Sequence, residues 1–210
     1  MRISPDRLNF FACGRHLSFD EQTRVANNIE QAYELTLVVR SQLGDEAAFA
    51  ELLRMYSPRL RFYVSKMLHD RHENAEDLLQ EIWLSVFRAL PKLNDTAAFR
   101  AWLFRIARDR VCREFRRHRI EFRSFDGQQV EHVAVDDELN EAVDREAVRQ
   151  QLDQLSTEHR EALVLRFIED MSCDDIARVT GSTLGTVRSR IHYAKRALRR
   201  AFEDKSYETK

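Results

Sequence analysis

Residues Ser172–Arg200 read SCDDIARVTGSTLGTVRSRIHYAKRALRR, and this stretch joins a short helical pattern, a glycine turn and a basic run. Ser172 can cap a first helix, and Gly181 can end it because glycine adopts the left-handed conformation of helix C-termini. Beyond the turn, apolar residues at helical spacing are Val187, Ile191, Ala194 and Leu198. They predict a second helix from about Leu184 to Glu203, held along one side by its apolar stripe. The two helices are typical of a helix-turn-helix.

The outward side of the second helix is strongly basic. Six Lys and Arg residues and no acidic residue lie between Gly185 and Arg200, although the chain has a net charge of −1. Guanidinium groups pair with guanine edges in the major groove, and basic side chains suit phosphates. A solvated basic helix is the alternative, but the preceding helix and turn favour DNA contact. The predicted DNA-facing residues are Thr186, Arg188, Ser189, Arg190, His192, Tyr193, Lys195 and Arg196. Those expected to read bases are Arg188, Ser189, His192 and Tyr193.

The composition favours helices. The 210 residues include only five Gly and three Pro, and 43% are hydrophobic, which suffices for real cores and argues against disorder. Three cysteines without a Cys-x-x-Cys pair indicate a reduced, cytoplasmic protein. No apolar run approaches the roughly 20 residues that a membrane span needs.

Helical periodicity extends over most of the chain. Helices are predicted over residues 19–44, from an N-cap at Asp45 onward, over AEDLLQEIWLSVFRAL and over 98–119. In the second domain, Ser156 is predicted to cap the helix TEHREALVLRFIED. The residues expected to face inward in the first three are Ile29, Tyr33, Leu37, Val38, Phe49, Leu52, Leu53, Tyr56, Leu78, Leu79, Ile82, Trp83, Val86 and Phe87. Residues 126–146 carry eight acids against one Arg and lose the periodicity, as in a linker.

We therefore predict an all-α fold of two small helical domains joined by a flexible acidic linker, the C-terminal domain being the helix-turn-helix. The expected division is an N-terminal extension (1–40), a first helical domain (41–119), the linker (120–145), the helix-turn-helix domain (146–204) and a tail (205–210).

Two helices of the first domain carry candidate functional faces. The helix over residues 98–119 mixes aromatic residues with arginines, which suits a nucleic-acid strand or a partly melted duplex. The helix before it opens with Glu76 and Asp77. These acids either complement the helix dipole or belong to an outward patch for a protein partner, and the sequence favours neither interpretation.

Four segments in this order resemble the extracytoplasmic-function sigma factors, the small two-domain group of the sigma-70 family. They are GDEAAFAELLRMYSPRLRFYV, AEDLLQEIWLSVFRAL, AFRAWLFRIARD and LDQLSTEHREALVLRFIEDMSCDDIARVTGSTLGTVRSRIHYAKRALRRAF. The resemblance covers about Leu43 to Phe202. The signatures AEDLLQE, FRAWL.RIA.D and GTVRSR are specific in combination, although each alone is weak.

The resemblance implies a role for each part of the first domain, which is similar to sigma region 2. One helix would dock on the clamp coiled coil of core RNA polymerase through Asp77, Gln80, Glu81 and Trp83. The loop Pro91–Ala98 and the following helix would capture the −10 promoter element, with one base flipped into a pocket. The implied −10 DNA-binding residues are Asn94, Asp95, Arg105, Arg108, Asp109, Arg113 and Arg116.

The second domain resembles sigma region 4, which reads the −35 element and touches the polymerase flap. The resemblance also implies regulation by an anti-sigma factor, no catalysis of its own and no insertion in a membrane. Neither a cofactor nor a metal is indicated. Residues 1–40 exceed the usual leader of the family. The alternatives for them are a regulatory extension, an extra packing helix and a start codon assigned too early.

Two other functions are weighed against this one. The first is an ordinary helix-turn-helix regulator whose N-terminal domain senses a ligand or dimerises, which would require a pocket in that domain. The second is a metal-dependent enzyme, with His69 and His72 at a spacing that could bind a metal on a helix, near acidic residues Glu73, Glu76 and Asp77. No second ligand pair, nucleophile with a base, or phosphate-binding glycine loop supports an enzyme.

Overall fold

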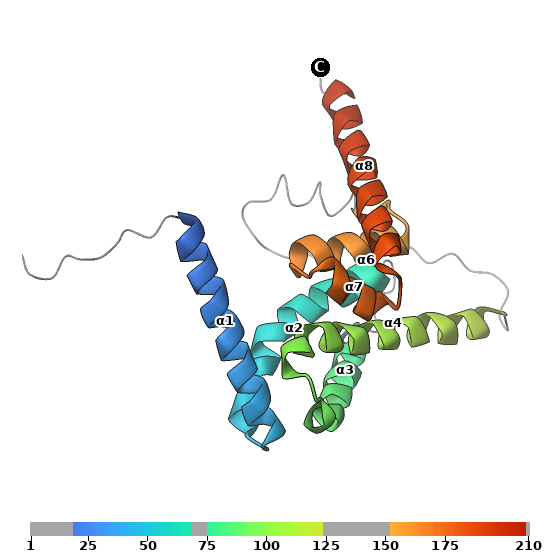
Figure 1. Ribbon diagram of the computed structural model, residues 1–210. Helices are drawn as coiled ribbons and strands as arrows, with labels where there is room; N and C mark the ends of the chain where they lie inside the picture. The colour runs from blue at the N-terminus through green and yellow to red at the C-terminus, as the bar shows by residue number, and fades with distance from the viewer. Residues whose placement is uncertain (1–18, 69–74, 124–151, 209–210) are drawn as a thin grey trace, which may run out of the picture.

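A computed structural model of the chain describes residues 19–68, 75–123 and 152–208 (Figure 1). The described residues form helices and no strand, so the predicted all-α fold is confirmed. Most of the predicted acidic linker lies outside the described residues, and its flexibility stays a prediction.

The first domain contains four long helices and two short 3-10 turns. Their bounds are α1 Phe19–Gln42, α2 Glu46–Leu68, α3 Ala75–Ala89, η2 Leu90–Lys92, η3 Thr96–Ala98 and α4 Phe99–Arg123. Asp45 caps α2 as predicted: its carboxylate accepts the N–H of Ala48 at 3.0 Å, and this bond lowers the pKa of Asp45, with help from Arg40. Pro58 neither interrupts nor restarts α2, which runs continuously past it.

Helix α2 runs through the centre of the core. Its Tyr56 and Tyr63 are fully buried, and their rings meet Phe99 and Phe104 of α4 edge to face at 5.5 and 5.3 Å. Burial of each such large side chain stabilises the fold by about 1.5–3 kcal/mol. The packing of α2 against α4 therefore fixes the position of the arginine-rich helix.

Helix α1 belongs to the same core, although the predicted boundary at residue 40 places most of it in the N-terminal extension. Leu37 and Val38 are buried, and the carboxylate of Glu34 accepts a hydrogen bond from Tyr56. Ile29 and Tyr33, which were expected to face inward, are exposed, and Tyr33 lies near the polar side chain of Glu51 on α2 instead of entering the core.

The second domain is built from α6 Thr157–Leu163, the π-helical turn η4 Val164–Ile168, α7 Cys173–Thr180 and α8 Leu184–Glu208. The predicted caps are confirmed: Ser156 accepts the N–H of His159, and Ser172 accepts that of Asp175. Gly181 ends α7 in the left-handed region, at φ +63°.

The apolar stripe of α8 holds the helix-turn-helix together. Val187 and Ala194 are completely buried, and Ile191 and Leu198 are partly buried against the core. The helix-turn-helix prediction is confirmed, and α8 projects away from the rest of the molecule in Figure 1.

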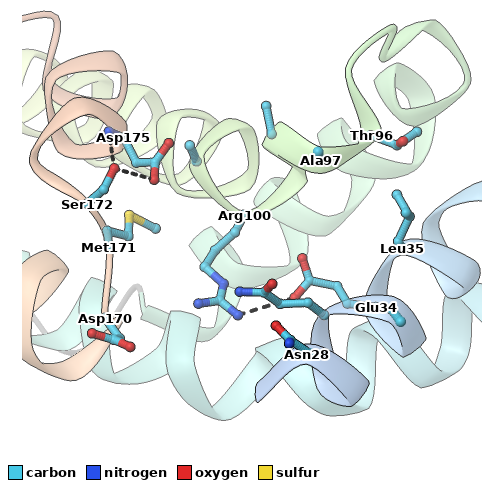
Figure 2. Close-up of a pocket in the computed structure, with 14 residues that line it drawn as sticks. Asn28, Glu34, Leu35, Thr96, Ala97, Arg100, Asp170, Met171, Ser172 and Asp175 are labelled. Atoms are coloured by element: carbon cyan, nitrogen blue, oxygen red, sulfur yellow. Dashed lines mark hydrogen bonds and ion pairs between the residues drawn. The ribbon is translucent and has the colours of Figure 1, made fainter. Parts of the chain in front are cut away.

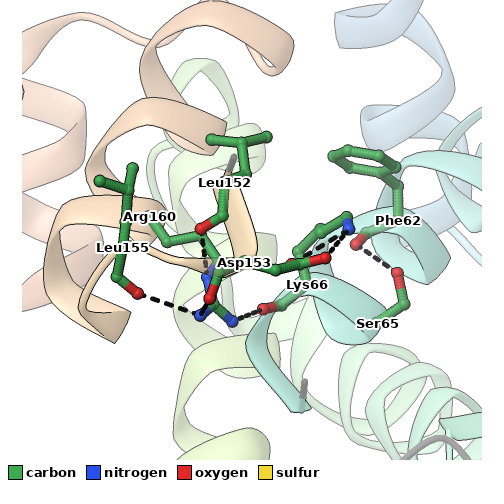
Figure 3. A network of polar contacts seen from close by, with 7 residues as sticks. All are labelled: Phe62, Ser65, Lys66, Leu152, Asp153, Leu155 and Arg160. Carbon is green, nitrogen blue, oxygen red and sulfur yellow. Dashed lines mark hydrogen bonds and ion pairs between the residues drawn. The ribbon is translucent and has the colours of Figure 1, made fainter. Parts of the chain in front are cut away.

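The two domains lie directly against each other. Helix α7 packs on α4 and the start of α6 meets the end of α2 (Figure 1), and one apolar core runs through both domains. Arg160 of α6 is buried at this junction and donates to the carbonyl oxygens of Lys66, Leu152, Asp153 and Leu155 at 2.7–3.1 Å (Figure 3). Close docking of the domains was not predicted from the sequence.

Candidate nucleic-acid and polymerase interfaces

The predicted DNA-facing residues of α8 form a continuous surface. Seven of the eight are exposed, and Arg190 is half-buried because its guanidinium donates to the Ser182 hydroxyl at 3.0 Å. At the start of the helix, Thr183 accepts the N–H of Thr186 at 3.2 Å, and the two hydroxyls share a hydrogen bond. The turn before α8 is thus tied to the helix, which presents a rigid face of polar and basic groups suited to the major groove.

An apolar groove lies beside α8, and the sequence did not predict it. It borders the predicted DNA-facing surface, since His192, Lys195 and Arg196 are among its lining residues. It has a volume of about 770 Å³, and its lining includes Leu163 and Leu198 with the exposed side chains of Phe167 and Ile168. The Lys195 ammonium lies 4.9 Å from the centre of the Phe167 ring, a cation–π contact. Phe167 and Ile168 are exposed in this groove because they belong to the π-helical turn Val164–Ile168. A π-helical turn holds about one residue more than an α-helical turn and so rotates their side chains away from the core.

The predicted polymerase-binding face of α3 is exposed at Asp77, Gln80 and Glu81, but Trp83 does not belong to it. The Trp83 side chain is only 8% exposed, and its ring packs edge to face on Phe49 at 6.0 Å. A contact role for Trp83 is therefore corrected to a packing role.

Two apolar residues lie on the α3 surface instead. Leu84 and Phe87 are each more than half exposed, although Phe87 was expected to face inward. Among the described residues, the ring that Phe87 meets is that of Phe49, at 5.2 Å, and more than half of its side chain is open to solvent. The α3 surface thus combines acidic and apolar side chains, which suits a protein partner.

The predicted −10 residues are spread along α4 and the loop before it. Asn94 and Asp95 are exposed, and the Asp95 carboxylate caps η3 by accepting the Ala97 N–H at 3.2 Å. Arg113 and Arg116 lie near the other end of α4. At 1.5 Å per residue, Phe99 and Arg116 are separated by about 25 Å, so these residues form an elongated surface and not one pocket.

Two of the predicted −10 DNA-binding residues, Arg105 and Arg108, form hydrogen bonds with the second domain. The Arg108 guanidinium donates to a carboxylate oxygen of Glu161 at 3.0 Å, and the Tyr63 hydroxyl donates to the same oxygen at 2.7 Å. Burial raises the pKa of Tyr63, and so does the neighbouring Glu161. Arg105 donates to the carbonyl oxygen of Arg178 at 3.3 Å. Asp109 is exposed on the same helix.

A polar cavity of about 680 Å³ lies where α1, the start of α4 and the turn before α7 meet (Figure 2). Arg100 reaches across it and donates to Glu34, the Tyr56 hydroxyl and the Glu169 carbonyl oxygen at 3.3–3.4 Å. The cavity lies between the two domains, whereas a ligand-sensing regulator would need its pocket inside the first domain.

A metal-dependent enzyme would need a metal site in the described part of the chain. No group of three or more His, Cys, Asp or Glu side chains that could hold a metal ion occurs there. His69, His72 and Glu73 lie outside the described residues. No described helix is long and apolar enough to cross a membrane.

Comparison with known proteins agrees with this architecture. Residues 52–120 match Sigma-70 region 2, and residues 145–198 match Sigma-70 region 4. The RNA polymerase sigma-H factor of Pseudomonas aeruginosa is 34% identical over 187 residues, which cover 83% of this chain and 96% of that protein. The ECF RNA polymerase sigma factor SigL of Mycobacterium tuberculosis is 36% identical over 168 residues, which cover 77% and 94%.

Solved structures give the same result. The sigma factor RpoE in complex with the anti-sigma factor NepR from Bartonella quintana superposes with a TM-score of 0.67 at 27% identity, covering 74% of this chain and 96% of RpoE. CnrH, in complex with the cytosolic domain of CnrY, shares the fold with a TM-score of 0.59 at 23% identity, covering 82% and 98%. Paired regions 2 and 4 define the class as sigma-70 factors. Within this class, the chain belongs to the extracytoplasmic-function group.

Proposed function

We propose that this sigma factor binds core RNA polymerase through α3 and the apolar groove beside α8, and directs initiation by holding a −10 element on α4 and a −35 element on α8. The observation that carries the proposal is the solvent-exposed face of α8, whose opposite side is anchored by the buried Val187 and Ala194. Such an arrangement presents side chains to DNA without rearrangement of the helix.

The −35 contact would be made by the first turns of α8. Arg188 and Ser189 are exposed near the helix start, where a recognition helix meets base edges. His192 and Tyr193 lie one turn further along, with their rings edge to face at 5.6 Å. Arg190, Lys195 and Arg196 would neutralise phosphates, and affinity for the duplex should therefore fall as the salt concentration rises.

The −10 contact would use the loop before α4 and the basic side of α4. The capped turn at Asp95 holds this loop in a fixed shape, which suits capture of an extruded base. Extrusion costs a few kcal/mol, which fitted contacts must offset. Arg113 and Arg116, both exposed, would follow the strand backbone away from that base.

Two surfaces would contact the polymerase. On α3, Asp77, Gln80 and Glu81 lie on the turns before the exposed apolar side chains of Leu84 and Phe87. On the second domain, the groove beside α8 exposes Phe167 between basic residues, and so fits an apolar segment with acidic flanks. We assign the first surface to the clamp coiled coil and the second to the flap.

The same surfaces make the chain a target for an anti-sigma factor, as RpoE is for NepR. We assign no catalytic activity to this chain, since synthesis of RNA belongs to the polymerase. We propose that it acts in the cytoplasm, where bacterial promoter DNA and core polymerase are found.

The test is run-off transcription from a genomic library with core polymerase, followed by mapping of the start sites. Start sites that share −10 and −35 motifs, and that are absent with core polymerase alone, would support the proposal. Specific duplex binding by the chain alone, without any core-dependent transcript, would instead identify an ordinary helix-turn-helix regulator.

A further inference from the structure

The loop between α3 and α4 has little regular structure of its own. It consists of the single 3-10 turns η2 and η3, with Leu93 and Asp95 in extended conformations between them. Besides the Asp95 cap, Leu93 and Ala98 each donate one backbone hydrogen bond within this segment, at 3.0 and 3.1 Å. Single turns of this kind open at low cost in free energy unless neighbouring elements hold them. A loop that receives an extruded base therefore needs support from outside.

Helix α1 supplies this support where the loop begins. Gln42, the last residue of α1, is half-buried and donates through its side-chain amide nitrogen to the carbonyl oxygens of Leu90 and Leu93, at 3.0 and 2.7 Å. The two N–H donors of the amide match these two oxygens. The oxygens lie at the start of η2 and just after its end, so a single side chain fixes the turn and the course of the chain that leaves it.

The same helix holds the chain where the loop ends. Glu34 of α1 is only 9% exposed, and its carboxylate pairs at 3.3 Å with the guanidinium of Arg100, in the first turn of α4 (Figure 2). The Tyr56 hydroxyl of α2 donates to the same carboxylate oxygen. A carboxylate this deeply buried requires such partners. The start of α4 is therefore tied to α1 and α2 together.

Both contacts come from one face of α1. Glu34, Val38 and Gln42 follow one another at intervals of four residues, and the buried Val38 lies between the two polar residues. At 1.5 Å per residue, Glu34 and Gln42 are about 12 Å apart along one rigid helix. Leu37 and Val38 anchor α1 on the core by apolar burial. The polar contacts can therefore be removed without detaching the helix, and what they add is a fixed position of the loop.

We propose that Gln42 and Glu34 are positioning residues for base capture at the −10 element, and that α1 holds the loop Pro91–Ala98 in the shape that receives the extruded base. Through this loop, α1 takes part in promoter opening. The inference rests on the proposed function of the loop. A loop that is already ordered when the base arrives avoids the cost of being ordered at that moment. Loss of the support should therefore slow opening and leave binding of core polymerase and of the −35 duplex unchanged.

The first test removes the amide donors of Gln42 and follows the loop by hydrogen exchange in the full-length free chain. Gln42→Met keeps a side chain of similar length without an N–H group, and Gln154→Met makes the same change at an exposed residue of the second domain. The backbone amides of residues 93–98 should exchange about tenfold faster in Gln42→Met than in Gln154→Met, as expected for loss of about one hydrogen bond.

The amides of α2 should keep the exchange rates of the parent in both variants. Unchanged exchange in the loop would show that Gln42 does not hold it. Faster exchange throughout the first domain would show that Gln42 supports the whole fold, which would equally overturn the proposal.

The second test measures opening by holoenzymes at a promoter mapped by run-off transcription. Permanganate reactivity of unpaired thymines reports opening of the duplex, which should be about tenfold slower with Gln42→Met than with Gln154→Met. When mismatches already unpair the −10 region, the two holoenzymes should initiate at nearly equal rates, because the base no longer has to be extruded from a paired duplex. An equal deficit on both templates, or no deficit on either, would overturn the proposal.

The other end of the loop is tested with Glu34→Gln. This change keeps the size of the side chain and removes the charge that pairs with Arg100, and Glu30→Gln at an exposed position of α1 is the matched control. We expect opening to be about threefold slower than in the control, since the amide oxygen still accepts a hydrogen bond. Opening as fast as in Glu30→Gln would remove Glu34 from the positioning residues.

Failure of the sigma function is distinguishable from failure of this inference. Run-off mapping without any core-dependent start site would contradict the sigma function, whereas hydrogen exchange would still decide whether α1 holds the loop. Core-dependent start sites together with full opening by Gln42→Met would retain the sigma function and overturn the role of α1.

Discussion

Arg188 is the residue of α8 at which a change should separate promoter recognition from polymerase binding. It is exposed near the helix start and away from the groove assigned to the flap. Arg188→Ala should reduce run-off transcription about tenfold or more at promoters that depend on the −35 element, because a bidentate arginine contributes about 1–3 kcal/mol of base discrimination.

Core binding by the Arg188→Ala variant, measured by pull-down, should be unchanged. Arg54→Ala, at an exposed arginine of α2 that belongs to neither proposed interface, serves as the control for loss of one positive charge. An equal loss of transcription from a promoter with a scrambled −35 element would show that Arg188 does not read that element.

Gly181 is the position where a single methyl group should destabilise the second domain. Its φ of +63° lies in the left-handed region, and a Cβ there would meet no atom within 4 Å, so any cost comes from the backbone alone. Gly181→Ala should lower the free energy of unfolding by about 1–2 kcal/mol in a urea titration. Gly185→Ala, within α8 and with only an ordinary contact at 3.9 Å, should be neutral or slightly stabilising. Equal effects of the two substitutions would contradict this account.

At the scale of the element, α3 is the helix whose outer face should determine polymerase binding. Glu81→Arg places a positive charge among Asp77 and Gln80, and we expect weaker capture of core polymerase in a pull-down. The Glu81–Arg110 pair at 3.1 Å is more than half exposed on the Glu81 side, so its loss should cost at most about 1 kcal/mol of stability. Circular dichroism checks the fold, and Glu158→Arg on α6 is the control. Undiminished capture by a folded Glu81→Arg variant would remove α3 from the interface.

Helix starts and ends were predictable where a local signal sets them. Asp45, Ser156, Ser172 and Gly181 act within one turn of their own positions, so sequence alone indicates their roles. Which face of a helix is buried depends on the helix that packs against it. Periodicity therefore placed Phe87 inside, although more than half of its side chain is open to solvent.

The same limit applies to the functional surfaces. The basic face of α8 was predicted because its charged residues and its apolar stripe lie in one helix and follow from the spacing of neighbouring residues. The burial of Trp83 depends on Phe49 of another helix, and its periodicity favoured packing while its place in the family motif favoured contact. The groove beside α8 depends on a π-helical turn, for which the stretch from Ala162 to Ile168, apolar except for Arg166, carries no distinctive signal.

At the scale of the whole molecule, docking of the two domains could not be read from the sequence. The linked pairs are 87 residues apart for Lys66 and Asp153 and 110 apart for Arg59 and Glu169. Within its own segment of sequence, each of these carboxylates looks like any other acidic residue of a helical region. Only the folded arrangement brings them to the basic side of α2 and α4.

Glu169 should make the stability of this arrangement depend on pH. Burial raises the pKa of its carboxyl above the usual 4.5, against the lowering effects of Arg59 and then Arg100. A carboxyl with a raised pKa binds its proton more tightly in the folded chain. The stability it confers therefore rises as the pH falls from above the folded pKa toward 4.5, and is lowest when Glu169 is ionised.

The measurement is urea unfolding of the parent and of Glu169→Gln at about pH 7.5 and about pH 5, a window set by this direction of the shift. Lowering the pH should stabilise the parent relative to Glu169→Gln, because only the parent gains a proton at this position. Asp170→Asn, at the exposed neighbouring residue, should follow the parent at both pH values. A difference between parent and Glu169→Gln that stays constant, or that changes in the opposite sense, would show that the proton of this buried carboxyl does not change the stability of the fold.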